Sequence, residues 1–147
     1  MRMKNIKMMN WKNFNNMNLK LDHIALNIID SKEVINFYQN VLGMVEIRKY
    51  ELDKDLAELF FNIRKNTTVY LMQKDELVLE LFINTKSYNH GFNHICIKVK
   101  NRGSIIDKAK NNSYKCIRRE REYFDQIFIS DRSGNIFEIK EIDRIDN

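Results

Sequence analysis

Two stretches of the chain alternate strictly between apolar and polar positions, and the two resemble each other. Residues 21–28 and 92–99 both follow the pattern x-x-His-Ile-x-aliphatic-x-aliphatic. A period of two predicts a strand with one apolar and one polar face. In the first strand the apolar face holds Ile24, Leu26 and Ile28, and the other face holds His23, Ala25 and Asn27. The chain therefore predicts an internal repeat with a histidine at the same place in each copy.

A helical pattern follows the first of these strands. Asp30 and Glu33 have the spacing of a capping box, and Ser31 is an alternative cap. Gly43 is placed to end the helix as a left-handed residue. The apolar face of this helix holds Val34, Ile35, Phe37, Tyr38, Val41 and Leu42. The pattern predicts a helix that packs on the sheet.

The second copy repeats this order with a shorter helix. Ser104 and Asp107 form the next capping-box pattern, and Asn111 and Asn112 are candidate left-handed terminators. The side chains predicted to be buried on this helix are Ile105, Ile106 and Ala109.

The remaining apolar runs predict further strands. In the first copy they cover residues 44–50, 57–64, 67–73 and 77–83, and in the second 114–120, 125–130 and 135–142. Residues 131–135 have the Gly and Asn of a turn that needs positive φ. Neither half can bury its sheet alone, so the two must pack together. We predict an α+β fold of two βαβββ modules whose curled mixed sheets form a partly closed, barrel-like cavity with the helices outside.

Each half also places an acid in the middle of its last strand. These acids are Glu80 and Glu138, and each is flanked by apolar neighbours. A lone His or Glu on a strand is usually a surface residue, but matched positions in a repeat favour a shared role. Two imidazoles and two carboxylates suit a divalent ion such as Zn, Ni, Co, Fe or Mn. His23, Glu80, His94 and Glu138 are therefore the predicted metal ligands, whereas His90 has no repeat partner and is expected to be exposed.

The distribution of charge argues against nucleic-acid binding. The net charge is +5, and the first 20 residues hold five basic and no acidic side chains, so the rest of the chain is neutral. We expect residues 1–19 to be a basic, flexible arm and residues 20–147 a single domain, with modules at about 20–84 and 91–142. Neither a membrane span nor a secretory signal is expected, and two cysteines indicate a reduced, cytoplasmic setting.

These motifs together resemble the vicinal oxygen chelate superfamily, the glyoxalase I-like proteins built of paired βαβββ modules. Residues 21–26 and the Phe-Tyr-x-x-x-Leu-Gly segment at 37–43 are similar to that family's first histidine strand and helix end. Residues 79–82 resemble its first ligand strand, and residues 92–97 its second histidine strand. Residues 129–139 resemble its closing Asp-Pro-x-Gly-Asn-x-x-Glu segment, with Arg132 where Pro is usual.

The resemblance implies a function. The His-Glu-His-Glu set is similar to that of glyoxalase I-like enzymes, so a metal-dependent lyase or isomerase is expected. It would act on a small-molecule substrate, thiol- or CoA-linked, through a metal-stabilised enediolate. Glu138 is the expected base, with Glu80 as the alternative catalytic residue, and no organic cofactor is implied. Members commonly pair modules across a dimer, so a homodimer is expected and the ligands come from one chain or two.

Other readings stay open at this point. A methylmalonyl-CoA epimerase-like enzyme would need a second acid, for which Asp53, Asp55 and Glu58 are candidates. A thiol transferase that confers antibiotic resistance would lack the mid-chain acid, and a non-catalytic small-molecule-binding module would lack the metal. Asn27 and Lys98, four residues beyond the two histidines, either line the cavity or lie at the wet edge of the sheet. The basic cluster Arg118, Arg119 and Arg121 likewise either contacts a thiol cofactor or is a solvated edge.

Overall fold

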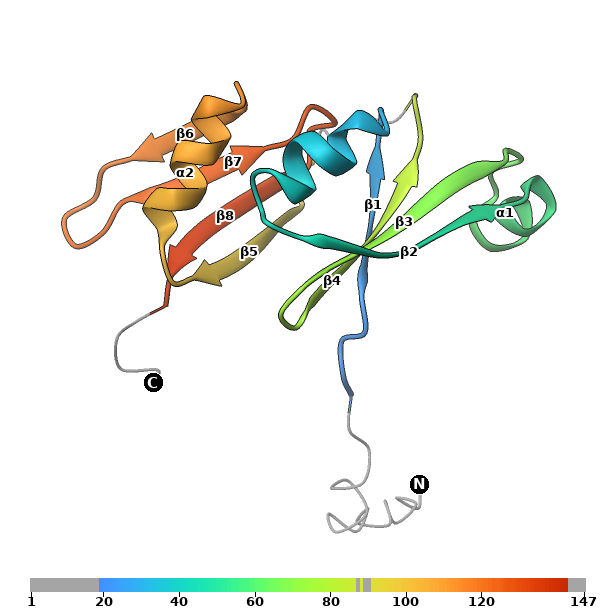
Figure 1. The fold of residues 1–147 in the computed structure, drawn as a ribbon, viewed down its shortest axis with the longest axis horizontal. Helices are drawn as coiled ribbons and strands as arrows, with labels where there is room; N and C mark the ends of the chain where they lie inside the picture. Colours follow the sequence, from blue (N-terminus) through green and yellow to red (C-terminus); the bar gives the residue numbers. More distant parts are fainter. Residues whose placement is uncertain (1–18, 87, 89–90, 143–147) are drawn as a thin grey trace, which may run out of the picture.

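The computed structural model describes residues 19–86, 88 and 91–142, and this part of the chain forms two four-stranded sheets side by side (Figure 1). The first sheet has the order β1-β4-β3-β2 and the second β5-β8-β7-β6. The first sheet is built from β1 (Ile24–Ile28), β2 (Val45–Leu52), β3 (Thr67–Lys74) and β4 (Leu77–Ile83). The second is built from β5 (His94–Val99), β6 (Lys115–Arg119), β7 (Gln126–Ser130) and β8 (Ile136–Glu141). The predicted α+β fold of two modules is confirmed.

The two sheets share the same pairing scheme. In each, the first strand runs parallel to the last, and the other neighbours are antiparallel. Ala25 pairs with Glu80 in the first sheet, and Cys96 pairs with Glu138 in the second. Ala25 and Cys96 each lie two residues after a histidine, so each histidine and its glutamate lie on the same face of their sheet.

The first helix is the π-helical segment η2 (Val34–Gln39), which spaces its hydrogen bonds more widely than an α-helix. Asn40 N donates to Ile35 O, and Gly43 follows with φ of 70°, as predicted for a left-handed end. The capping-box prediction is wrong for Glu33. Asp30 does accept from Lys32 N, but Glu33 is only 1% exposed and points into the second module.

Glu33 is buried because the second module satisfies its carboxylate. It accepts hydrogen bonds from the Tyr114 hydroxyl at 2.8 Å and from the Arg132 backbone N–H at 3.0 Å. The Arg132 guanidinium adds an ion pair, with Nη1 at 3.0 Å from Oε1. A buried charge persists only with such partners.

The strand predicted over residues 57–64 is a helix, α1 (Lys54–Phe61). Asp53 caps it by accepting from Asp55 N and Leu56 N, and Asn62 ends it with φ of 57°. Its apolar residues lie mostly on the surface, and only Ala57 is buried. The local cap therefore decided the structure of a segment whose apolar run resembled a strand.

The helix of the second module, α2 (Arg102–Asn111), forms where predicted but with different ends. Its N-cap is Asn101, which accepts from Ser104 N at 2.9 Å, so Ser104 is a donor and not the cap. The left-handed residue after the helix is Ser113 with φ of 60°, not Asn111 or Asn112. No helix in the described part of the chain is long and apolar enough to cross a membrane.

The modules are joined on their helical side. Phe37 of η2 lies against Tyr114 and Phe137 of the second module, with ring centroids 4.9 and 5.6 Å apart. The predicted turn before β8, with Gly134 at φ of 81°, forms a hydrogen bond with the first module. Its Asp131 accepts from the Tyr38 hydroxyl at 2.7 Å. The opposite face of each sheet, which carries Ala25 in one and Cys96 in the other, stays exposed.

Candidate metal centre

The first His–Glu pair lies immediately before β1 and in the middle of β4. His23 Nε2 is 3.1 Å from Glu80 Oε2. The other ring nitrogen, Nδ1, is 2.7 Å from Asp22 Oδ2. That hydrogen bond raises the pKa of His23, and the nearby Glu80 charge raises it further, against a lowering by burial.

The second pair occupies the equivalent strands of the other module. His94 Nε2 is 3.6 Å from Glu138 Oε2, and His94 Nδ1 is 2.9 Å from Phe92 O. The edge of the Phe128 ring also lies near the imidazole, with centroids 5.9 Å apart. Both histidines are part-exposed, and both glutamates are mostly covered.

Both imidazoles are oriented as metal ligands are. An Nδ1–H held by an oxygen acceptor fixes the tautomer and leaves the Nε2 lone pair available. In each module that Nε2 faces the carboxylate of the paired glutamate. Two ligands bound to one ion at about 2.1 Å lie about 3.0–3.4 Å apart, close to the observed separations. Each pair therefore fits half of a divalent-metal site.

One chain does not bring the two pairs together. Among the described residues, no group of three or more His, Cys, Asp or Glu side chains is arranged to hold a metal ion. Each sheet exposes its own pair, because the modules pack through their helical sides. The structure thus pairs each predicted histidine with its predicted glutamate but separates the two modules' ligands. His90 lies outside the described residues.

Three residues that sequence reasoning did not assign to the site contact the glutamates. The Tyr50 hydroxyl donates to Glu80 Oε1, and burial followed by this hydrogen bond raises the pKa of Tyr50 to about 12. Gln126 Nε2 lies 3.4 Å from Glu138 Oε1, and Lys140 Nζ lies 3.9 Å from the same oxygen. Glu80 is therefore held by a hydroxyl hydrogen bond, whereas Glu138 has the longer contacts to Gln126 and Lys140 and a hydrogen bond with the Cys96 thiol.

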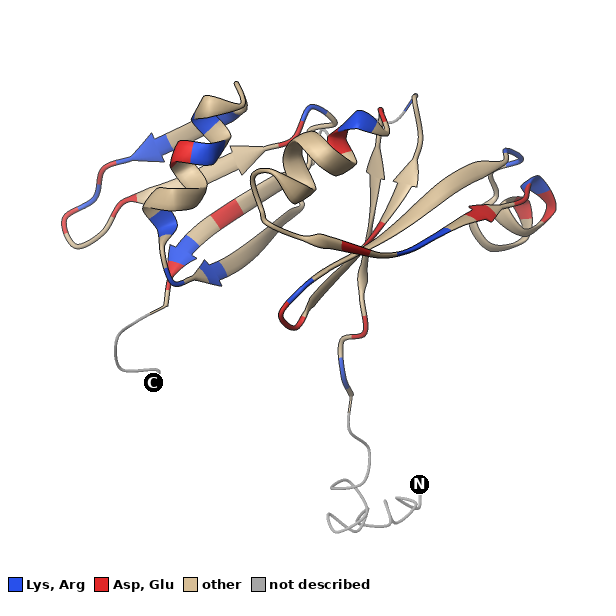
Figure 2. Cartoon of the chain, in the orientation of Figure 1, with Lys and Arg blue, Asp and Glu red and all other residues tan. Residues whose placement is uncertain are grey.

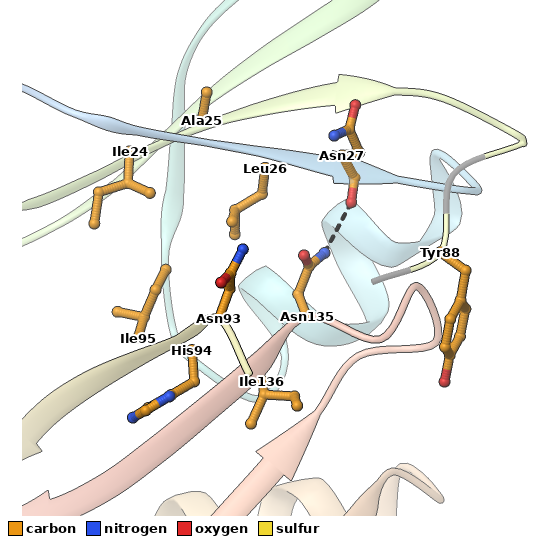
Figure 3. Close-up of a pocket in the computed structure, with 10 residues that line it drawn as sticks. All are labelled: Ile24, Ala25, Leu26, Asn27, Tyr88, Asn93, His94, Ile95, Asn135 and Ile136. Carbon is orange, nitrogen blue, oxygen red and sulfur yellow. Dashed lines mark hydrogen bonds between the residues drawn. The ribbon is translucent and has the colours of Figure 1, made fainter. Parts of the chain in front are cut away.

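Three clefts formed by the described residues border this region. One of about 510 Å³ lies where β1 approaches β5 and β8, and the His94 ring points away from its Asn27 side (Figure 3). Asn135 Nδ2 donates to Asn27 O across it at 2.8 Å. A cleft of about 800 Å³ lies between the β3–β4 turn and α2. Neither cleft is lined by Glu80 or Glu138.

The third cleft, of about 350 Å³, lies beneath α1 and is mainly apolar. Phe61 of α1 meets Phe82 of β4 edge to face, with centroids 5.6 Å apart. Phe82 is two residues beyond Glu80 and on the same face of the sheet. Asn27 also lines this cleft, where its Oδ1 accepts from Asn84 Nδ2 at 3.3 Å.

The three acids considered as second bases have other contacts. Asp53 caps α1. Arg64 Nη1 is 3.1 Å from Asp55 Oδ1 and also pairs with Glu58. All three therefore stabilise α1, one as its cap and two through ion pairs on its surface.

Comparison with known proteins gives one family and one fold. A family model described as the Glyoxalase/Bleomycin resistance protein/Dioxygenase superfamily matches residues 20–139. The chain resembles the trypanothione-dependent glyoxalase I of Leishmania major at 21% identity and a TM-score of 0.62, covering 84% of this chain and 87% of that one. It resembles the fosfomycin resistance protein FosX of Listeria monocytogenes at 18% identity and a TM-score of 0.66, covering 88% and 98%.

A variant of that Listeria protein, determined in complex with Mn(II) and 1S,2S-dihydroxypropylphosphonic acid, matches at 19% identity and a TM-score of 0.64, covering 84% of this chain and 93% of that one. A search of curated protein sequences gives no match. At these identities the solved structures establish the fold alone.

Proposed function

Because the chain belongs to the glyoxalase/bleomycin resistance/dioxygenase superfamily, we propose that it is a divalent-metal-dependent lyase or isomerase of the glyoxalase I type. Its site would be completed by a second copy of the chain. The observation that carries this proposal is the matched pair of His–Glu contacts, each with Nδ1 anchored and Nε2 directed at a carboxylate. The ion would be held by His23 and Glu80 of one copy and His94 and Glu138 of the other.

The exposed sheet faces support pairing of two copies. Val45 pairs with Gln73 on the face that carries Glu80, and it is 64% exposed. Ile117 pairs with Phe128 beside Glu138 and is 49% exposed. Apolar side chains gathered around polar ligands on two open faces are typical of a surface that another protein covers. Face-to-face packing of module one on a partner's module two would bury the exposed apolar side chains of both faces.

The two glutamates would have different tasks. When bound, the ion supplies Lewis acidity that makes the α-proton of a carbonyl substrate more acidic. Glu80, tied to Tyr50, would serve as a fixed ligand. Glu138 has only the weak thiol donor Cys96 and the longer contacts to Gln126 and Lys140, so it would move toward a substrate and accept a proton more readily. We therefore assign the base to Glu138.

The competing functions in this family receive less support. Glu80 occupies a ligand position that a thiol transferase of the resistance type does not need. An epimerase needs a second acid, and Asp53, Asp55 and Glu58 are engaged around α1. Cys96 and Cys116, the cysteines among the described residues, are free thiols. We place the enzyme in the reducing cytoplasm, acting on a thiol-linked small molecule.

Metal uptake by purified variants tests the proposal. His23→Ala, Glu80→Gln, His94→Ala and Glu138→Gln should each weaken binding of Zn(II) or Co(II), and His90→Ala, the remaining histidine, should not. Turnover is then compared for hemithioacetals of methylglyoxal with glutathione, bacillithiol and coenzyme A, and for fosfomycin with and without thiols. Metal uptake that none of the four substitutions weakens would refute the metal site. Turnover of fosfomycin but of none of the hemithioacetals would assign the chain to the resistance branch.

A further inference from the structure

The helix α1 covers one end of the ligand face of the first sheet and has no counterpart in the second module. It lies in the connection between β2 and β3, residues 53–66, whereas residues 120–125 join β6 to β7 without a helix. Val69 of β3 pairs with Phe82 and is fully buried on this otherwise open face. Ala57 of α1 is also buried, and neither Val69 nor Ala57 belongs to the main core. A small second core therefore forms beneath α1.

The cleft of about 350 Å³ beneath α1 reaches the first His–Glu pair. Ala25 lines this cleft and is the direct strand partner of Glu80. Phe82 lines it as well and lies two residues beyond Glu80 on the same face, about 6–7 Å along the strand. A group bound in the cleft is therefore adjacent to whatever the metal centre holds on its Glu80 side.

The polar side chains that line this cleft already have partners. Asn27 Oδ1 accepts from Asn84 Nδ2 at 3.3 Å, and Thr67 Oγ1 donates to Ile83 O at 2.6 Å. Lys65 is the charged residue among the described residues of the lining. In Figure 2 the charged colours at this end of the sheet lie on α1 and on the end of β2, and the adjoining parts of β3 and β4 are tan. The cleft therefore favours an apolar group, which gains by leaving water, over a polar one.

Polar contacts at the ends of α1 hold the helix over the cleft. Asp53 caps the first turn, and Asn66 Oδ1 accepts from Lys54 N at 2.7 Å. With the helix held in this way, Phe61 lines the cleft and is still 53% exposed. An aromatic ring so exposed beside a hollow offers apolar surface that a ligand can cover. The cleft is therefore formed before any ligand enters it.

We propose that the cleft beneath α1 binds a bulky apolar substituent of the substrate, an aryl or branched alkyl group, and that Phe61 determines this specificity. The inference rests on the proposed function, because Glu80 would hold the ion that binds the carbonyl end. It names the substrate class: a carbonyl compound whose apolar substituent lies next to the reacting carbonyl. A volume of about 350 Å³ is at the lower end of small-molecule sites, and a methyl group would leave most of it empty.

Benzyl alcohol tests the cleft in the full-length, metal-free protein. Its titration is followed through the backbone amide resonances, and the shifts should centre on Ala57, Phe61 and Thr67. Phe61→Ala should weaken binding about tenfold, through loss of an aromatic contact. Phe60→Ala is the matched control, because it removes the same side chain from the next position, where the ring is 64% exposed and does not line the cleft. It should leave the affinity unchanged.

Two 2-oxoacids test the specificity in the Zn(II)-loaded protein. Phenylglyoxylate and pyruvate present the same pair of adjacent oxygens to an ion and differ in carrying a phenyl or a methyl group. Isothermal titration should show phenylglyoxylate binding at least about tenfold more tightly, because the larger apolar surface is buried. Phe61→Ala should remove most of this difference by weakening phenylglyoxylate alone, and Phe60→Ala should preserve it.

The two titrations separate failure of the cleft from failure of the proposed function. Benzyl alcohol shifts that are absent or spread over both open faces overturn the cleft as a binding site. Equal affinities for the two 2-oxoacids, or equal losses of phenylglyoxylate binding in Phe60→Ala and Phe61→Ala, overturn the assigned specificity. Absent metal uptake in the unmodified protein refutes the proposed function alone, because the benzyl alcohol titration needs no metal.

Discussion

The two modules of this chain have the same backbone plan and different chemistry. Both place a histidine at or immediately before the start of the first strand and a glutamate in the last, with matching register. Around this shared frame the first module adds α1 and ties its glutamate to Tyr50. The second holds its glutamate through the Cys96 thiol and a longer contact to Gln126, and it places Lys98 and Lys140 beyond that glutamate. The repeat thus fixes where ligands lie, and the unrepeated neighbours decide what each ligand does.

Replacing each glutamate with glutamine, which removes the carboxylate charge, should give the largest effect of the variants that test this difference. Glu138→Gln should lower turnover by about 10²–10⁴-fold, the contribution of a general base, at metal concentrations that saturate the variant. Glu80→Gln is the matched control, because it removes the same charge from the equivalent strand. It should act mainly through metal affinity. If Glu80→Gln loses more turnover than Glu138→Gln at saturating metal, Glu80 is the base and Glu138 is the fixed ligand.

Separating the modules should have the next largest effect. Glu33→Ala leaves the Tyr114 hydroxyl and the Arg132 guanidinium without their buried acceptor. We expect a loss of about 3 kcal/mol in the free energy of unfolding, at the low end for a broken buried pair because Arg132 is half exposed. Urea denaturation measures it. Glu76→Ala, in the exposed β3–β4 turn, should cost under about 0.5 kcal/mol, and equal losses in both variants would refute the account of Glu33.

Removing the hydroxyl that holds Glu80 sharpens the contrast between the glutamates. Tyr50→Phe should weaken metal binding about tenfold, the lower end of the effect of losing a partner of a metal ligand. Isothermal titration with Zn(II) gives the affinity. Gln126→Leu is the comparison in the other module, where the contact is longer, and it should change affinity less. An equal or larger effect of Gln126→Leu would contradict the asymmetry.

Proton competition at His23 gives the smallest effect. The Asp22 carboxylate raises the pKa of His23, and a protonated imidazole cannot bind metal. Metal binding should therefore be lost as the pH falls through that raised pKa. Asp22→Asn lowers the pKa of His23, so the midpoint of Co(II) binding should move to lower pH. A midpoint that stays in place, or rises, would show that Asp22 does not govern this histidine.

The sequence predicted the parts of the fold that depend on alternation within one strand. The strand over residues 77–83 has the predicted bounds in β4, and both histidines lie where the pattern placed them. The repeat alone was enough to pair each with its glutamate. These features depend on neighbours in sequence or on matched positions, both of which are visible in the chain.

The features that sequence reasoning missed depend on distant partners or local irregularity. A register shift between Glu46 and Arg48 changes which face of β2 each later residue occupies, so alternation could not place Tyr50 beside Glu80. Glu33 resembled a capping residue because its partners, Tyr114 and Arg132, lie 81 and 99 residues away. The four ligands could not be assigned to one chain or two, because that depends on an assembly.

Mixing two defective variants tests directly whether each site is shared between chains. His23→Ala and His94→Ala proteins are unfolded together, refolded and titrated with Co(II) at a concentration that neither binds alone. If module one of one chain completes module two of the other, each mixed dimer regains one intact site. Random pairing then gives about one ion per four chains. A mixture that binds no more metal than its separate components would contradict a site built from two chains.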